Sequence, residues 1–227
     1  MALAVAHRGD PLAHRENTLE AFQSAESLGA DMVELDCKLT RDGHVVVLHD
    51  DTLGRLWRVR KPVRGVEWAE VSAIRADGYR IPDLAEALDA VRLPVMVDVS
   101  ATDAMEASLS VVRRARATDR CVFAGATSAL LVLRRLSRTA RIALTWDRRR
   151  LPQGGLLAAT KPEWFNPHHS NATPKVVERM HAAGVGVSVW TVDRDPQIHR
   201  VLRAGVDAVI SNRTARLVAA VHASPAA

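Results

Sequence analysis

Residues 29–50 read GADMVELDCKLTRDGHVVVLHD, and this segment decides the fold. Two apolar runs, at 33–40 and 45–49, are separated only by the four residues 41–44, which begin with Arg-Asp-Gly. Four residues cannot form a helical crossover, whereas Asp-Gly between two apolar runs is a strong signal for a β-hairpin. We therefore expect the two strands to be antiparallel, so that only the first of them belongs to a parallel sheet.

Outward from this segment, short apolar strands alternate with helical stretches along the whole chain. Helical spacing of apolar residues predicts helices over 18–30, 82–91, 128–137, 174–183 and 196–204. Strands are predicted over 3–7, 32–39, 45–49, 94–99, 121–124, 141–146, 164–166, 185–192 and 206–211. When the second hairpin strand is set aside, eight strands with about seven helices between them remain, which is the pattern of a (β/α)8 barrel.

This alternation predicts an α/β fold, namely a (β/α)8 TIM barrel with a small β-hairpin insertion after strand 2. An open, doubly wound parallel sheet is the competing architecture. Neither a G-x-G-x-x-G motif nor a P-loop follows the first predicted strand, so the commonest ligand signal of that architecture is missing. We expect one domain over residues 1–221 and a frayed C-terminal tail over 222–227.

Composition excludes several classes of protein. The chain has 227 residues, 48% of them apolar, and a formal net charge of +5, which argues against a disordered chain. Cys37 and Cys121 lack CxxC spacing, so neither a disulfide scaffold nor a cysteine-bound zinc site is expected. No apolar run approaches the ~18 residues of a membrane span, and residues 1–10 do not resemble a secretory signal. We expect a cytoplasmic protein without stable membrane insertion.

The basic residues do not indicate a nucleic-acid partner. Only four of them are lysines, and the arginines are spread along the chain. The densest cluster, at 148–150, has no aromatic residues interleaved with it, although stacking aromatics usually accompany a basic nucleic-acid site. The oligomeric state stays open.

Glu34 and Asp36 lie on the second predicted barrel strand, and catalytic groups of such barrels sit at the carboxyl ends of strands. Because they are two residues apart, their side chains project from the same face. Crowded carboxylates repel one another unless a cation lies between them, and Mg²⁺ or Ca²⁺ binds through oxygen ligands. The pair is therefore a candidate site for one divalent cation, and a solvated pair at a sheet edge is the alternative.

Two further side chains join this pair. With Asp42 and Gly43 as the two turn residues, the hairpin register places His49 opposite Asp36, at the ~5 Å Cβ separation of cross-strand partners. A shift by one residue would turn His49 to the opposite face. Asp98 lies in the apolar segment 94–100. Because an unpaired carboxylate is costly to bury there, we expect it to face either the same cation or an arginine.

The first predicted strand ends with His7, Arg8 and Gly9. Histidine exchanges a proton near neutral pH, arginine offers a planar fork to phosphate oxygens, and glycine lets the backbone approach a ligand closely. Taken alone, the triplet is explained more simply by a structural histidine. Together with His49 and the carboxylates, it predicts phosphate-ester chemistry in which one histidine takes a proton and the other gives one.

Several motifs resemble the glycerophosphodiester phosphodiesterase family, in order and through nearly the whole chain. They are AHRG (6–9), ENTLEAF (16–22), GADMVELD (29–36), TRDGHVVVLHDDTLGR (40–55), IPDLAEAL (81–88), VSVWTVD (187–193) and GVDAVISN (205–212). The resemblance implies a (β/α)8 barrel, one divalent cation, Mg²⁺ or Ca²⁺, and a small-molecule phosphodiester substrate. The reaction it implies is hydrolysis of glycerophosphodiesters to glycerol phosphate and an alcohol.

The resemblance also implies roles for individual residues. His7 and His49 would be the acid–base pair, Arg8 would contact phosphate, and Trp190 would wall the substrate pocket. The metal ligands would be Glu34, Asp36 and Asp98.

The chain departs from the family pattern at two places. The family usually has E-x-K where this chain has Asp98-Val99-Ser100, so Ser100 stands where a substrate-binding lysine is expected, and Asn212 replaces a usual Asp. Two alternatives follow. One is a catalytically weak or inactive relative that binds metal and a phosphate-bearing ligand. The other is a phosphodiesterase acting on lysolipids or sphingolipids.

Overall fold

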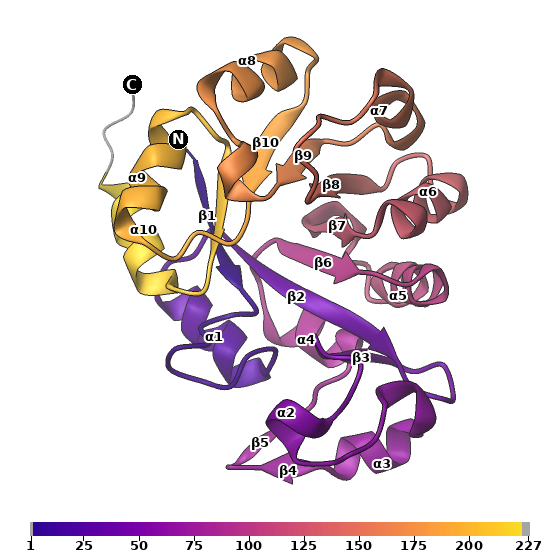
Figure 1. The fold of residues 1–227 in the computed structure, drawn as a ribbon. Coiled ribbons are helices and arrows are strands. Elements are labelled where there is room, and N and C mark those ends of the chain that lie inside the picture. The colour runs from indigo at the N-terminus through magenta and orange to yellow at the C-terminus, as the bar shows by residue number, and fades with distance from the viewer. Residues whose placement is uncertain (1, 224–227) are drawn as a thin grey trace.

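The computed structural model describes residues 2–223. Within them, eight parallel strands form a closed ring, because β1 pairs with both β2 and β11 (Figure 1). The predicted (β/α)8 barrel is confirmed. The barrel strands are β1 (Leu3–His7), β2 (Met32–Leu39), β6 (Val95–Val99), β7 (Cys121–Gly125), β8 (Arg141–Trp146), β9 (Trp164–Pro167), β10 (Gly186–Val189) and β11 (Ala208–Ser211).

Helices surround the ring of strands (Figure 1). Thr18 caps the helix that begins at Leu19, and the helix that begins at Leu84 has a capping box between Asp83 and Glu86. Both starts therefore follow from local sequence. The surrounding helices are α1 (Leu19–Ser27), α4 (Leu84–Ala90), α5 (Thr102–Arg114), α6 (Thr127–Leu136), α7 (Gly154–Thr160), α8 (Pro174–Ala182), α9 (Asp195–Arg203) and α10 (Thr214–His222). Two short 3₁₀ helices, Thr118–Arg120 and His169–Asn171, lie in the connections.

The apolar core has two layers. Larger groups of buried side chains fill the space between strands and helices. A smaller group fills the barrel interior and closes it below the carboxyl ends of the strands. That group consists of Val5, Met32, Met96, Val122, Ala124, Ala143, Trp164, Ala208 and Ile210.

The hairpin after β2 is confirmed as antiparallel, but its predicted register is wrong by one residue. Strand β3 (Val45–Val47) pairs with β2 through Cys37 and Val47, and Leu48 N–H, not His49, donates to the Asp36 carbonyl at 2.9 Å. The turn contains three residues rather than two, with Gly43 at φ +78°. A three-residue hairpin loop with glycine in the left-handed region accommodates this extra residue.

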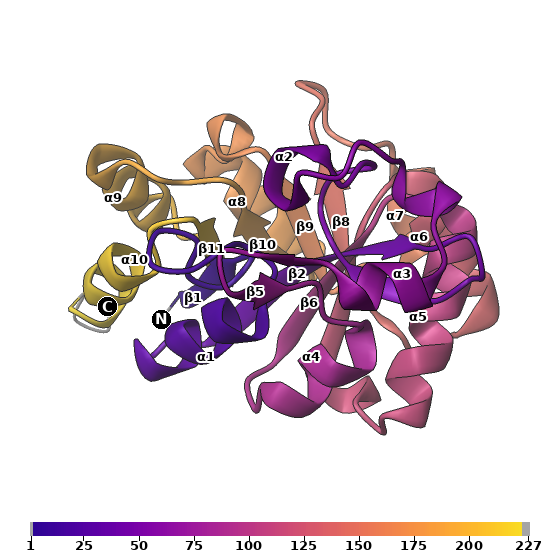
Figure 2. The same ribbon diagram turned by 90° about the horizontal axis from the view of Figure 1, so that it is seen from below.

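The insertion after β2 is larger than a hairpin. Between β3 and α4 it contains α2 (Gly54–Trp57), a 3₁₀ helix (Val63–Gly65), α3 (Trp68–Ala73), β4 (Arg75–Ala76) and β5 (Tyr79–Arg80). In Figure 2, α2 and the loop that follows β8 rise at the same end of the barrel. The insertion has an apolar cluster of its own, which includes Leu53, Trp57 and Val71.

The last helix runs to His222, and Ala223 is its C-cap. The rest of the tail predicted over 222–227 lies outside the described residues. Cys37 and Cys121 are buried and free. Over the described part of the chain, no helix is both long and apolar enough to cross a membrane.

The turn after β1 contains Gly9, and substituting this residue tests whether close packing fixes the turn. The φ of Gly9 is +86°, and a Cβ there would lie 2.6 Å from the Ala21 carbonyl carbon. Gly9→Ala should therefore lower the free energy of unfolding by about 2 kcal/mol or more, because overpacking adds to backbone strain. Gly43→Ala should cost only about 1 kcal/mol, the strain alone, since nothing lies within 4 Å of its Cβ position. Urea denaturation measures both, and equal losses would contradict the packing argument.

Candidate functional site

A cavity of about 160 Å³ lies at the carboxyl ends of the barrel strands. All of the predicted site residues except Ser100 line it, so strands far apart in sequence bring them together. Its floor is apolar, made by Met96 and Ile210. The full lining is His7, Arg8, Glu34, Asp36, His49, Met96, Asp98, Thr145, Asn166, Trp190 and Ile210.

The chain turns sharply where β1 ends, and this turn aims two groups at the cavity. Arg8 has φ +57°, a conformation that non-glycine residues rarely adopt and that often marks a functional site. Its backbone N–H donates to Glu34 Oε2 at 3.0 Å, and its carbonyl accepts from Asn17 N–H at 3.0 Å. The strained turn is thus held by bonds to the site itself.

Three carboxylates share the cavity. Asp36 on β2 is directly beside Asp98 on β6 in the sheet register, and Glu34 on β2 is 4% exposed. Burial, with the charges of Asp36 and Asp98 added, raises the pKa of Glu34 well above its usual range. Burial and the neighbouring Asp36 raise the pKa of Asp98 to about 7. The neighbouring side chains therefore do not supply enough positive charge to offset these three carboxylates.

Asp36 is the best compensated of the three. The Asn17 side chain makes two hydrogen bonds to Asp36. Its Nδ2 donates to Asp36 Oδ2 at 2.8 Å, and its Oδ1 accepts from Asp36 N–H at 3.2 Å. Arg8 Nε also lies 3.2 Å from Asp36 Oδ2. Asn17 has φ +59°, and the adjacent Thr18 provides the helix cap, which leaves the Asn17 amide free for this role.

The chemistry of the donor set fits a hard divalent cation. The side-chain carboxylate of Asp98 has no hydrogen bond or ion pair to any residue of the described segment 2–223, although it faces two other carboxylates. Oxygen donors in this number suit Mg²⁺ or Ca²⁺. Across the same segment, no group of three or more His, Cys, Asp or Glu side chains stands in a geometry that could hold a metal ion. The donors are thus gathered around one cavity without enclosing a point between them.

His7 is held in a defined orientation. Asn212 Nδ2 donates to Asp193 Oδ2 at 2.8 Å, and a carboxylate can only accept, which fixes the Asn212 amide. Asn212 Oδ1 therefore accepts from His7 Nδ1 at 2.7 Å, so the proton of the neutral ring is on Nδ1. Its Nε2, 3.9 Å from Glu34 Oε2, is free. Burial and the Arg8 charge lower the pKa of His7.

His49 reaches the cavity from the opposite side. Strand β3 ends at Val47, two residues earlier, so the alternation of faces in the strand no longer decides where His49 points. Its Nδ1 donates to Asp50 Oδ1 at 2.8 Å. Hydrogen bonds from Arg55 hold the pKa of Asp50 at about 2, so this carboxylate stays ionised beside the imidazole.

An ion-pair network joins the two halves of the site. Arg55 Nη2 donates to Glu16 Oε1 at 2.6 Å, and Arg8 Nη1 donates to the same oxygen at 2.9 Å. Glu16 therefore links Arg8 on the first barrel loop to the insertion that carries His49. Sequence reasoning assigned no role to Glu16 or Arg55, although both lie in the motifs that carry the family resemblance.

Ser100 lies outside the cavity. Strand β6 ends at Val99, and Ser100 follows as an exposed residue whose Oγ accepts from Lys38 Nζ at 3.5 Å. Both residues line a neighbouring hollow of about 450 Å³.

Trp190 does line the cavity. Its Nε1 donates to the Asn166 carbonyl at 2.9 Å, which holds the ring in place.

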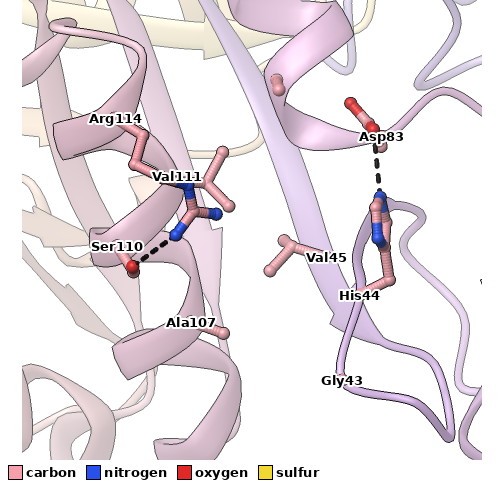
Figure 3. Close-up of a pocket in the computed structure, with 9 residues that line it drawn as sticks. Gly43, His44, Val45, Asp83, Ala107, Ser110, Val111 and Arg114 are labelled. Carbon is pink, nitrogen blue, oxygen red and sulfur yellow. Dashed lines mark hydrogen bonds and ion pairs between the residues drawn. The ribbon is translucent and has the colours of Figure 1, made fainter.

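A hollow of about 260 Å³ on the outer surface is larger than the barrel cavity. It lies between the hairpin turn, α4 and α5, and Figure 3 shows its lining residues. Its ionisable side chains are already engaged, since His44 Nε2 lies 3.0 Å from Asp83 Oδ2 and Arg114 Nη1 donates to Ser110 Oγ at 2.7 Å. Perturbed groups converge in the barrel cavity and not here, so the barrel cavity is the candidate active site.

Comparison with known proteins agrees with this location. Residues 7–216 match the model of the "Glycerophosphoryl diester phosphodiesterase family". A glycerophosphodiester phosphodiesterase of Caldanaerobacter subterraneus is 28% identical over 237 residues, covering 95% of this chain and 96% of the relative. The "Probable glycerophosphodiester phosphodiesterase 2" of Mycobacterium tuberculosis is 31% identical, covering 93% and 87%. The structure of an Oleispira antarctica phosphodiesterase with its product sn-glycerol-3-phosphate superposes with a TM-score of 0.89 at 22% identity, covering 96% of each chain.

The raised pKa of Asp98 predicts how stability changes with pH in the absence of metal. The folded chain keeps this proton up to pH ~7, whereas an unfolded aspartate loses it near pH 4. Raising the pH through this window therefore favours the unfolded chain. Asp98→Asn removes the titration, so in EDTA its free energy of unfolding relative to wild type should rise from pH 5 to pH 8.

Urea denaturation at the two pH values measures this difference. The control is Asp89→Asn, which alters an exposed carboxylate on α4. Added Ca²⁺ at pH 8 should stabilise wild type more than Asp98→Asn. Identical pH dependence in wild type and Asp98→Asn would contradict the crowding of charge.

Proposed function

The chain belongs to the glycerophosphoryl diester phosphodiesterase family, and from this premise we propose that it hydrolyses glycerophosphodiesters to glycerol 3-phosphate and an alcohol by histidine acid–base catalysis. It is a phosphoric diester hydrolase. One observation carries the finer proposal. Two imidazoles, each with its Nδ1 held by a hydrogen bond, flank a single cavity lined by three carboxylates.

The proposed cofactor is one divalent cation, Mg²⁺ or Ca²⁺, held by Glu34, Asp36 and Asp98. The unpaired Asp98 carboxylate and the raised pKa of Glu34 support this, because both are relieved by added positive charge. When bound, such an ion supplies charge that polarises the phosphoryl group. The proposed donors come from the neighbouring strands β2 and β6, where Asp36 is directly beside Asp98 in the sheet register.

His7 is the proposed general base. Since Asn212 Oδ1 accepts a hydrogen bond from His7 Nδ1–H, the lone pair of the neutral ring is on Nε2. The lowered pKa keeps that ring neutral near pH 7. Nε2 can therefore accept the proton of the water whose oxygen forms the new bond to phosphorus. Asn212 carries no charge, and it still fills the place of the usual aspartate as the acceptor for His7.

His49 is the proposed general acid. The ionised Asp50 accepts from Nδ1, so it orients the ring and stabilises the imidazolium. The Nε2 proton is then given to the oxygen of the departing alcohol as its bond to phosphorus breaks. One water is consumed, and the proton taken by His7 replaces, in the overall balance, the one given by His49.

Substrate size follows from the cavity. Its volume of about 160 Å³ lies below the roughly 300–1,000 Å³ of pockets that take drug-sized ligands. This favours a glycerol-headed diester with a small alcohol over a lysolipid or sphingolipid. Arg8 is the proposed phosphate contact, and the Trp190 ring is the proposed wall against which the glycerol unit lies.

Loss of either histidine should remove most of the activity. For His7→Ala and His49→Ala we expect kcat for glycerophosphocholine to fall about 10²- to 10⁴-fold, the usual effect of losing an acid or base. His199→Ala, an exposed histidine on α9, is the matched control. EDTA should abolish turnover in wild type, and Mg²⁺ or Ca²⁺ should restore it. Release of glycerol 3-phosphate measures all of these. Full turnover in either variant, or in EDTA, would overturn the mechanism.

A further inference from the structure

The cavity has few cations for an anionic substrate. Among the described residues that line it, Arg8 is the one permanent cation. Arg8 is already engaged, with Nη1 2.9 Å from Glu16 Oε1 and Nε 3.2 Å from Asp36 Oδ2. The side chains of these two carboxylates, Glu16 and Asp36, are only 16% and 12% exposed, so water screens both ion pairs weakly. A phosphodiester anion would therefore meet an arginine whose charge is largely neutralised.

Lys38 stands next to this cavity in the strand register. It follows Glu34 and Asp36 at the same two-residue spacing on β2, so the three side chains share one face. It lies about 6.6 Å beyond Asp36 toward the carboxyl end of the barrel, by the rise of two strand residues. Because Cys37 pairs with Val99, Lys38 is beside Ser100, and the distance from Nζ to Oγ is 3.5 Å.

The charge of Lys38 reaches the carboxylate cluster. Lys38 is two residues beyond Asp36, which is directly beside Asp98 in the sheet. The Lys38 side chain is itself only 17% exposed, so its field is weakly screened by water. Positive charge is therefore present at the edge of the cavity nearest Asp98.

The counter-ion of Lys38 can be displaced. Lys38 Nζ pairs with Asp51 Oδ1 at 2.6 Å, but the Asp51 side chain is 87% exposed. A carboxylate so exposed regains full hydration when it leaves, which lowers the cost of separating the pair. The lysine stem is flexible and its ammonium is a compact charge. Lys38 is thus free to turn from Asp51 to an entering anion.

We propose that Lys38 is a substrate-binding residue, whose ammonium leaves Asp51 and contacts the phosphate oxygens at the cavity mouth. Lys38, on β2, supplies positive charge at a position where the adjacent Ser100, which follows β6, carries none. This inference rests on the proposed function, since the ligand is the phosphodiester of that reaction.

Lys38→Met tests the proposal, with Lys61→Met as matched control. Lys61 lies in the insertion and forms a similar lysine–carboxylate pair with Glu70 at 2.5 Å. In saturating Mg²⁺ or Ca²⁺, we expect Lys38→Met to weaken binding of glycerol 3-phosphate at least 10-fold by calorimetry. We also expect kcat/KM for glycerophosphocholine to fall 10- to 100-fold, whereas Lys61→Met matches wild type in both. Equal binding by the two variants would overturn the proposal.

A structural role for the Lys38–Asp51 pair gives a different result. If Lys38 only anchored the loop that carries Asp51, Asp51→Asn would weaken binding as much as Lys38→Met does, and that outcome also overturns the proposal. If Lys38 binds phosphate, Asp51→Asn leaves KM unchanged or lowers it, because the ammonium is released. The double variant Lys38→Ser with Ser100→Lys should recover at least part of the lost binding, and no recovery would contradict the proposed position of the charge.

Two measurements distinguish failure of the Lys38 proposal from instability of the variant and from failure of the proposed function. Lys38→Arg retains charge and should bind glycerol 3-phosphate within a few-fold of wild type, even if Lys38→Met is unstable in thermal denaturation. If wild type binds glycerol 3-phosphate but does not release it from any glycerophosphodiester, the proposed function fails. The binding comparison still decides the role of Lys38 in that case.

Discussion

Three carboxylates crowded at one end of the barrel are the constraint on which the rest of the site depends. Glu34 and Asp36 alternate on β2, and Asp98 is beside Asp36 on β6. In a poorly solvated place such a cluster repels itself, and the surrounding chain responds to it. The turn at Arg8 takes a strained backbone conformation and gives its N–H to Glu34. The Asn17 amide grips Asp36 from the next loop.

The Nδ1 atoms of the two histidines are hydrogen-bonded to different kinds of group, so the two imidazoles have different electrostatic surroundings. A neutral amide faces Nδ1 of His7, whereas an ionised carboxylate faces Nδ1 of His49. The amide brings no charge to His7, whereas the carboxylate places a negative charge beside His49. Glu16 and Arg55 tie the two sides together through paired charges. A single cavity can therefore hold both a proton acceptor and a proton donor.

Much of the fold followed from local sequence. The Asp-Gly turn separated the one antiparallel strand from the barrel strands, and the remaining strands were located within a few residues. The helices α5, α7 and α10 were not located. Each begins without a capping side chain, but so do α6 and α9, which their apolar spacing did reveal. The hairpin register was wrong because the turn holds three residues, a choice that Arg41 and Gly43 do not reveal by themselves.

The candidate site was predictable where strand ends supply the groups, as for His7, Glu34, Asp36 and Asp98. It was not predictable where loops supply them. Asn17 was assigned no role in the site, because its contact with Asp36 depends on the fold of the loop between β1 and α1. His49 was predicted to face the cavity from a register that is wrong, and it lines the cavity because the chain leaves the strand before it. The end of β6 at Val99 was predicted correctly, and Ser100 follows it outside the cavity.

The closure of the ring has a consequence for the order in which the chain is made. His7 leaves the ribosome before its acceptor Asn212, which is 205 positions later in the chain. Thr214, which bonds the Gly9 carbonyl, is equally remote from its partner. A nascent or clipped chain that stops before β11 would carry both histidines and all three acidic groups, yet its first strand would lack one of its two neighbours and His7 would lack its acceptor. The ring closes, and His7 gains its partner, only when the final strand is in place.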